Sequence, residues 1–218
     1  MSDEYKAREH YQKADVAGEY EERRFASWHG RLAHRAEMRA IRRAIERYFS
    51  PGGKVLDLPC GTGRLFGVYA AGDYQVTGCD ISDEMLAIAQ KAYADSDRFS
   101  FIKNEAERLP FDDDAFDYLV SFRFMSHLPT EVRRVVTSEM LRVTKGALVV
   151  NYDLLNWSPM MMVNRMFRSW TCSPHLLKRR ELEEELDGMG VKVCEMRPLS
   201  WYDRSATVVV MRKRDAAV

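Results

Sequence analysis

One short segment limits the fold of this chain more than any other. Residues 55–63, Val-Leu-Asp-Leu-Pro-Cys-Gly-Thr-Gly, join an apolar run to a turn with two glycines. The apolar run is typical of a strand buried on both faces, and glycine lets the backbone turn sharply and approach a ligand closely. A helix expected from Arg64 onward presents unpaired N–H groups to the same turn. This order predicts a parallel sheet with a ligand site at the carboxyl end of its strands.

Six more β-rich runs follow this first one. The seven runs span residues 55–58, 75–80, 100–105, 116–122, 147–152, 191–196 and 207–212. Helical segments are expected between the first five runs, which makes those strands parallel and covers both faces of the sheet. No helix is expected between the last two, so we expect them to pair antiparallel at one edge. The sequence therefore predicts an α/β fold with a doubly wound, seven-stranded sheet, mostly parallel with an antiparallel edge strand.

Helix positions can also be predicted from residue order. Ser82 and Thr130 each precede an apolar periodic segment, and serine and threonine are preferred N-cap residues. Upstream, apolar residues recur at steps of three and four from Met38 to Phe49, with arginines between them. This spacing predicts an amphipathic helix, which the Ser-Pro-Gly-Gly cluster at 50–53 ends.

Charge and length restrict the class of protein. The 218 residues include Lys+Arg 33 and Asp+Glu 33, so the formal net charge is zero. This balance gives no general electrostatic attraction to nucleic acid or membranes. The length suits one domain, for which we expect four parts: an N-terminal helical cover (1–50), a ligand-binding core (54–152), an insertion after the fifth strand (153–177), and a C-terminal helix and strand pair (178–218).

Location and metal content follow from simple patterns. No apolar run reaches the roughly 18 residues that span a bilayer, and the start, MSDEYKAREH, lacks the features of a secretory signal. We therefore expect a cytoplasmic protein. The cysteines at 60, 79, 172 and 194 lie at no metal-binding spacing, so reduced thiols and no metal site are expected.

Three acidic residues follow predicted strands and are candidates for ligand binding. Asp57 beside the glycine turn disfavours a pyrophosphate and suits a cationic ligand. Asp80 can accept two hydrogen bonds from a ribose diol, although aspartate in this position also serves turns and caps. Glu105 is a candidate acceptor for the exocyclic amine of adenine. Phe66 stands where a dinucleotide motif has its third glycine, which argues against a dinucleotide site.

These motifs, in this order and spacing, resemble the class I S-adenosylmethionine-dependent methyltransferases, in a branch like methyltransferase type 11. The pattern is DxGCGTG, then D-x-S, then D/E-A-E-x-L-P-F, then FD before the fourth strand and HLP after it. The resemblance covers residues 54–152. The sequence departs from the pattern at Pro59, at Asn104-Glu105 and at 125–127, Met-Ser-His.

The resemblance implies a Rossmann-like fold, S-adenosyl-L-methionine as cofactor and S-adenosyl-L-homocysteine as product. A sulfonium ligand carries no phosphate, which agrees with the acidic residues around the glycine turn. Asp57, Gly61 and Gly63 are placed around the methionine part of the cofactor and Asp80 on the ribose. The full set of expected cofactor-binding residues is Asp57, Pro59, Gly61, Gly63, Asp80, Ile81, Met85, Glu105, Ala106, Ser121 and Phe122, with Tyr20 and Arg24 from the N-terminal cover.

Candidate acceptor residues follow the fourth and fifth strands. His127 is a candidate base for methylation of an oxygen, or it shapes the start of the next helix. Arg123 can bind a carboxylate or phosphate on the acceptor, or it is a surface arginine at a strand end. The segment 153–177, rich in methionine and aromatic residues, is either an extra core helix or a lid over an acceptor pocket.

The leading functional hypothesis is in-line methyl transfer, at oxygen, to a small or amphiphilic, lipid-like acceptor with or without an anionic group. The alternatives are a methyltransferase of RNA or protein that docks through the arginines of residues 23–47, and a non-catalytic partner subunit that binds the cofactor. Residues 1–50 hold 11 basic and 9 acidic groups, which favours a solvated helix face over a nucleic-acid site.

Overall fold

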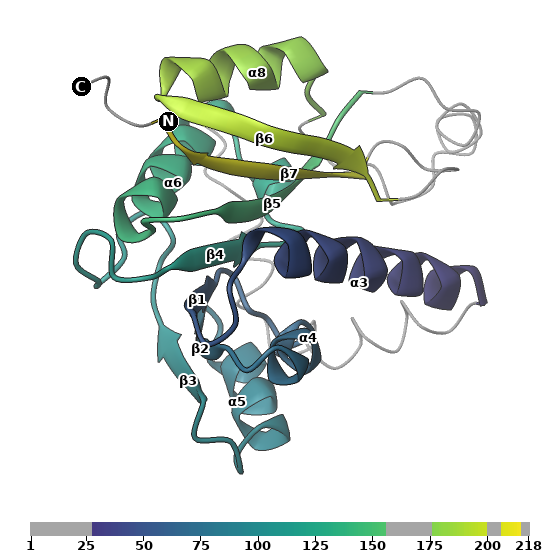
Figure 1. The fold of residues 1–218 in the computed structure, drawn as a ribbon, viewed down its shortest axis with the longest axis vertical. Coiled ribbons are helices and arrows are strands. Elements are labelled where there is room, and N and C mark those ends of the chain that lie inside the picture. Colours follow the sequence, from purple (N-terminus) through teal and green to yellow (C-terminus); the bar gives the residue numbers. More distant parts are fainter. Residues whose placement is uncertain (1–27, 156–175, 200–205, 215–218) are drawn as a thin grey trace.

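A computed structural model of the chain describes residues 28–155, 176–199 and 206–214, and these form a single seven-stranded sheet flanked by helices (Figure 1). The strands are β1 (Lys54–Asp57), β2 (Gln75–Asp80), β3 (Phe99–Lys103), β4 (Tyr118–Ser121), β5 (Leu148–Asp153), β6 (Val191–Pro198) and β7 (Ala206–Lys213). The helices are α3 (Trp28–Tyr48), α4 (Phe66–Ala71), α5 (Asp83–Ala92), α6 (Thr130–Val143) and α8 (Arg179–Gly188), with a short 3-10 turn, η1 (Met125–His127).

The strand order is β3-β2-β1-β4-β5-β7-β6. The first five strands in the chain run parallel to one another, whereas β7 runs antiparallel to both β5 and β6. The predicted α/β fold, with seven strands and antiparallel pairing at one end of the sheet, is confirmed. The last two strands do not add to the sheet in chain order. The final strand, β7, lies beside β5, and β6 is the outermost strand.

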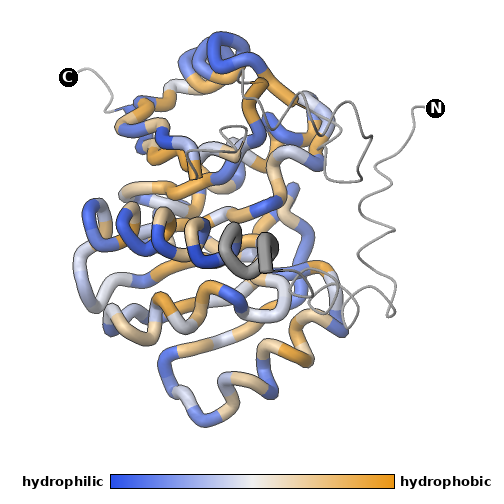
Figure 2. The backbone as a smooth tube through the Cα atoms, turned by 90° about the vertical axis from the view of Figure 1, so that its right-hand side faces the viewer, coloured by the Kyte–Doolittle hydropathy of each residue, from blue (hydrophilic) through white to orange (hydrophobic). Residues whose placement is uncertain are grey.

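Two apolar layers hold the helices on opposite faces of the sheet. Successive strand residues point to opposite faces, so Val55 packs with α3 and α4 while the next residue, Leu56, packs with α6 and α8. In Figure 2 the hydrophobic backbone segments follow the strands, and hydrophilic segments lie on the outer turns of the helices. The sheet is therefore buried on both faces, as expected for a doubly wound fold.

The predicted amphipathic helix is α3, which packs through Ile41, Ala44 and Ile45. It ends at Tyr48, before the predicted Ser-Pro-Gly-Gly cluster. The predicted cap at Ser82 is also confirmed, because its hydroxyl accepts a hydrogen bond from the backbone N–H of Met85. Both features depend on local residue spacing, which explains why the sequence could predict them.

Two local predictions were wrong. Thr130 is the first residue of α6 rather than its cap, because the extended backbone of Pro129 takes the N-cap position. The segment 104–117 between β3 and β4 contains no helix. Instead α6 fixes this loop: Arg142 donates to the carbonyl oxygens of Leu109 and Phe111, and Glu139 accepts from the Leu109 N–H. These side-chain bonds replace the backbone bonds that a helix would supply.

A buried ion pair joins the two helices on the second face. Arg133 on α6 donates to both carboxylate oxygens of Glu185 on α8, at 2.9 and 2.6 Å. The same guanidinium donates to the Leu128 carbonyl and the Thr130 hydroxyl, each at 3.3 Å. Arg133 is only 1% exposed. The pair is thus a buried charge whose hydrogen-bonding groups are satisfied by protein.

Some predictions fall on residues outside the described ranges. They are Tyr20 and Arg24, Cys172, most of the insertion 153–177, and the turn 200–205. The division into four parts stays a prediction. Among the described residues, no helix has the length and apolar character needed to cross a membrane, and no cluster of three His, Cys, Asp or Glu side chains could hold a metal ion.

Candidate functional site

The carboxyl ends of β1, β2 and β4 surround a cavity of about 150 Å³. Its wall comes from the turn after β1, the ends of β2 and α5, and the loops after β3 and β4. This is the edge at which open α/β sheets bind their ligands. The lining residues are Asp57, Leu58, Pro59, Cys60, Gly61, Thr62, Arg64, Leu65, Asp80, Ile81, Met85, Asn104, Ala106, Glu107, Phe122, Arg123 and Phe124.

The two glycines of the turn after β1 have different structural roles. Both have positive φ, +54° at Gly61 and +81° at Gly63, where other L residues are strained. A Cβ at Gly61 would meet no atom within 4 Å, so the backbone there is open to a ligand on the cavity wall. A Cβ at Gly63 would lie 3.0 Å from the Tyr93 ring and 3.3 Å from Ala89. Gly63 therefore lets the turn pack on α5 rather than lining the cavity.

Asp80 ends β2 and fixes the β1 turn. Its Oδ2 accepts from the Gly61 N–H at 2.8 Å, and its Oδ1 accepts from the Ser82 N–H at 3.0 Å. Burial raises the pKa of Asp80, and these backbone donors oppose that rise. A carboxylate has about four acceptor sites, so Asp80 retains capacity for two further donors such as a ribose diol.

Asp57 is a buried carboxylate that lacks a hydrogen-bond donor among the described residues. It is 1% exposed, and neither oxygen accepts a hydrogen bond from a described residue. Burial raises its pKa well above the usual range, and the neighbouring Asp80 charge adds to the rise. The Tyr69 hydroxyl and Arg64 lower the pKa in part, although the hydroxyl lies at a geometry that makes no hydrogen bond. A cationic ligand in the cavity would favour the charged form of Asp57.

The loop after β3 presents different residues from those predicted. The Asn104 amide donates to the carbonyl oxygens of Glu105 and Arg108, which curls the chain. As a result Asn104, Ala106 and Glu107 line the cavity, while Glu105 is exposed and lies outside the wall. Glu107 was not among the predicted residues, because the position of an acidic side chain in such a loop depends on the curl rather than on strand alternation.

The loop after β4 lines the opposite side with Phe122, Arg123 and Phe124. Ser121, the last residue of β4, is buried and does not line the cavity. His127 lies in η1, half-buried and also outside the lining, with its N–H bonded to the Phe124 carbonyl at 2.9 Å. The catalytic role predicted for His127 stays a prediction.

A cluster of charged residues links α3 to this cavity. The buried Glu37 carboxylate forms ion pairs with Arg64 and Arg123, which both line the cavity. Arg64 also contacts the His34 ring at 2.9 Å. The sequence analysis missed Glu37, although a signal existed: it lies four residues before Ile41, which lies four before Ile45, so all three share the buried helix face.

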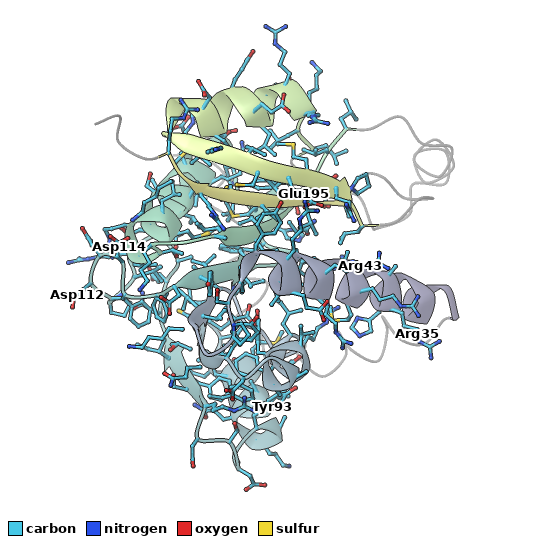
Figure 3. All side chains as sticks on the ribbon, viewed as in Figure 1. Arg35, Arg43, Tyr93, Asp112, Asp114 and Glu195 are labelled. Atoms are coloured by element: carbon cyan, nitrogen blue, oxygen red, sulfur yellow. The ribbon has the colours of Figure 1, made fainter. Side chains whose placement is uncertain are left out.

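The exposed acidic run 112–114 and the outer face of α3 lie apart from this cluster. Asp112 and Asp114 project at the other end of the β4 region from Arg35 on α3 (Figure 3). Asp113 pairs with Arg142 and Asp114 with Lys213, which agrees with a solvated turn. Arg35 and Arg43 are exposed on α3.

The structure brings most of the predicted cofactor residues together. Those on the cavity wall are Asp57, Pro59, Gly61, Asp80, Ile81, Met85, Ala106 and Phe122. Gly63, Ser121 and Glu105 are outside the wall. The cavity has carboxylates at the β1 and β2 ends, guanidinium groups from Arg64 and Arg123, and apolar surface between them. This arrangement suits a ligand with a cationic centre and an apolar part.

Part of the chain is similar to known methyltransferases. Residues 55–146 match the model of a family described as "Methyltransferase domain". Demethylmenaquinone methyltransferase of Clavibacter sepedonicus is 38% identical over 101 residues, 45% of this chain and 40% of that protein. Putative methyltransferase YqeM of Bacillus subtilis is 33% identical over 132 residues, 60% of this chain and 53% of that protein. The chain spans about half the length of these curated relatives.

A solved structure agrees over nearly the whole chain. Magnesium protoporphyrin IX methyltransferase from Synechocystis PCC 6803 with bound SAH has a TM-score of 0.75 and covers 97% of this chain and 100% of its own. Its identity is 15%, so this likeness concerns the fold. Together with the family match over 55–146 it confirms the resemblance predicted from the sequence motifs.

Proposed function

We propose that this chain, which carries a class I S-adenosylmethionine-dependent methyltransferase domain, transfers a methyl group from S-adenosyl-L-methionine to a small lipid-like acceptor. The observation that supports this most is Asp57, a fully buried carboxylate that lines the cavity and accepts no hydrogen bond from the described residues. An unpaired buried charge is costly unless it serves a ligand. The sulfonium and ammonium groups of the cofactor are ligands of the required sign.

Different residues would bind different parts of the cofactor. Asp80 would hold the ribose hydroxyls with its remaining acceptor sites, and Asp57 would face the cationic methionine part. Gly61 would let that part approach the backbone. The bound cofactor supplies a methyl group on a sulfonium, which a nucleophile displaces in line. The protein then acts by aligning the two reactants and excluding water, effects worth up to roughly 7–11 kcal/mol.

The acceptor class rests on the relatives and on the cavity wall. Curated relatives over about half of the chain are named demethylmenaquinone methyltransferases, which supports an acceptor of the quinone type. The apolar rings of Phe122 and Phe124 on the wall agree with such an acceptor. Oxygen stays our expectation for the methylated atom, with His127 as its base.

Calorimetric titration with S-adenosyl-L-homocysteine tests the cofactor site. We expect micromolar binding by the native chain and a loss of at least tenfold, about 1.4 kcal/mol, in Asp80→Ala. Asp83→Ala is the matched control, because Asp83 follows closely on α5 but pairs with Lys103 at the surface. Equal affinity in native and Asp80→Ala, or no binding by the folded native chain, would contradict the proposal.

A screen of quinols, phenols and RNA, with release of S-adenosyl-L-homocysteine as readout, tests the acceptor. Turnover of a quinol or phenol with the methyl group on oxygen is expected. Methylated RNA would instead support the docking role of the α3 arginines. Cofactor binding without turnover of any acceptor would support the non-catalytic alternative.

A further inference from the structure

Three successive residues after β4 face the same cavity, which a strand cannot achieve. Side chains alternate between faces along a strand, yet Phe122, Arg123 and Phe124 all line the wall. Arg123 has φ +56°, a left-handed conformation that is unfavourable for a non-glycine L residue. Its N–H donates to the Asn151 side chain on β5 at 3.3 Å, which helps to hold the turn. The backbone is thus bent so that an arginine and two rings share one surface.

The Arg123 guanidinium is held on this surface by two neighbours. It lies over the Phe122 ring, 5.7 Å from the centroid, and it pairs with the Glu37 carboxylate of α3. Glu37 is 6% exposed in its side chain and Arg123 36%, so the carboxylate is buried whereas the arginine, which lines the cavity, is partly exposed. Glu37 also pairs with Arg64. Arg64 and Arg123 thus contact the same carboxylate, and both line the cavity.

We propose that Arg123 determines acceptor specificity: it binds an anionic oxygen of an aromatic acceptor whose ring packs against Phe122 and Phe124, and Glu37 is the residue that positions it. This inference rests on the proposed function, because it assumes that the cavity holds a methyl acceptor. A planar guanidinium with several donors is suited to bind a carboxylate or phenolate oxygen. Phenylalanine rings supply apolar contact at low cost in side-chain entropy.

The location of Arg123 favours the acceptor over the cofactor as the source of the anion. Asp57 and Asp80 end β1 and β2, whereas Arg123 follows β4 and is next to Phe122 and Phe124 in the sequence. Arg64, in the turn after β1, pairs with the same Glu37 carboxylate as Arg123. The cofactor also carries a carboxylate, however, and the same guanidinium chemistry would bind it. The experiment therefore has to separate the two sources.

The first arm uses two ring probes that differ by one carboxylate, 1-hydroxy-2-naphthoate and 1-naphthol, titrated into protein saturated with S-adenosyl-L-homocysteine. We expect the native chain to bind the naphthoate about tenfold more tightly or better. Arg123→Met is expected to remove this preference and to leave 1-naphthol affinity within about twofold. The proposal would be overturned if the native chain bound both probes equally well, or if Arg123→Met lowered the affinity for both probes by the same factor.

Arg98→Met is the matched control for this arm. Arg98 also lies over a phenylalanine ring, 5.9 Å from the Phe99 centroid, and pairs with Asp73 at 37% exposure. It is not on the cavity wall. We expect its substitution to leave both naphthyl affinities unchanged; a loss of the naphthoate preference in Arg98→Met would overturn the assignment to Arg123.

The second arm compares S-adenosyl-L-homocysteine with 5′-methylthioadenosine, which lacks the amino-acid part of the cofactor. The proposal predicts the same affinity of native and Arg123→Met for both compounds. If the variant binds S-adenosyl-L-homocysteine more weakly but keeps its affinity for 5′-methylthioadenosine, Arg123 binds the cofactor carboxylate and the acceptor role is overturned. Failure of the folded native chain to bind S-adenosyl-L-homocysteine would instead contradict the proposed function itself.

Discussion

Two buried carboxylates on opposite sides of the molecule differ in what surrounds them. Glu185, between α6 and α8, accepts two hydrogen bonds from the buried Arg133. Asp57, at the end of β1, lies beside a second carboxylate, Asp80, and accepts none from a described residue. Both are less than a tenth exposed. Burial alone therefore does not distinguish a structural charge from a ligand-binding one, whereas the donors around it do.

Paired and unpaired buried carboxylates have opposite effects on the stability of the folded protein. A paired buried charge is costly to break, because removal of one partner leaves the other uncompensated. An unpaired buried charge already destabilises the ligand-free protein, and the ligand recovers that free energy when it binds. We expect substitutions at the two sites to change stability in opposite directions.

The largest effect is expected from Arg133→Met. The substitution leaves the Glu185 carboxylate buried without a donor, so we expect the free energy of unfolding to fall by about 3–5 kcal/mol. Urea denaturation followed by circular dichroism measures it. In the double variant Arg133→Met/Glu185→Leu most of that loss is expected to return, because both charges are gone. A single variant that unfolds like the native chain would show that the pair is not a structural element.

Asp57→Asn is expected to stabilise the ligand-free protein. Because the native pKa of Asp57 is raised by burial, the folded state holds its proton while the unfolded state has lost it. The contribution of Asp57 to native stability therefore falls as pH rises above the usual aspartate range, near pH 4, with a slope of about 1.4 kcal/mol per pH unit until the native pKa is reached.

Asn carries no such penalty. The advantage of Asp57→Asn is thus small near pH 4 and grows toward pH 7, and unfolding curves of both proteins at several pH values measure it. Asp80 is present in both proteins, and because its charge raises the pKa of Asp57, the difference reports on the coupled pair. A constant difference at all pH values would contradict the unpaired state of Asp57.

Glu37→Gln is expected to have an intermediate effect. Its amide oxygen still accepts from arginine but lacks the charge that Arg64 and Arg123 share. The two arginines are 16% and 36% exposed, and water compensates in part. We expect a loss of about 1 kcal/mol in the free energy of unfolding. A gain in stability would mean that Glu37 resembles Asp57 rather than Glu185.

The smallest effect is expected at an exposed pair. Arg180 and Glu184 on α8 form an i,i+4 pair at 2.7 Å with both side chains mostly exposed. Such pairs contribute about 0.3–0.5 kcal/mol on a helix, so Arg180→Ala is expected to change stability by no more than this. A loss as large as that of Arg133→Met would remove the contrast between buried and exposed pairs.

The parts of the fold that the sequence predicted are those with local signals. The apolar runs of the strands, the glycine turn at 55–63 and the Ser82 cap are each set by a few neighbouring residues. The positions of Asp57 and Asp80 at the site follow from this, since each ends a predicted strand. The order of β6 and β7 depends on packing between distant segments and could not be predicted in the same way.

The missed residues depend on tertiary contacts. From the sequence alone, Arg133 is an ordinary helix arginine. Its role follows from the packing of α8, which places Glu185 within hydrogen-bond distance. Glu107 reaches the cavity because Asn104 curls the loop. Glu37 had a sequence signal in its spacing to Ile41, but only the position of α3 beside the β4 loop pairs it with Arg123.

The most direct test of the ligand-binding role of Asp57 measures stability and cofactor affinity in the same variant. Asp57→Asn is expected to unfold at higher urea than the native chain at pH 7 and yet to bind S-adenosyl-L-methionine at least tenfold more weakly, about 1.4 kcal/mol by calorimetry. The opposite signs would show that a stability cost is kept for ligand binding. Unchanged cofactor affinity, or a variant that is less stable than the native chain, would contradict this role.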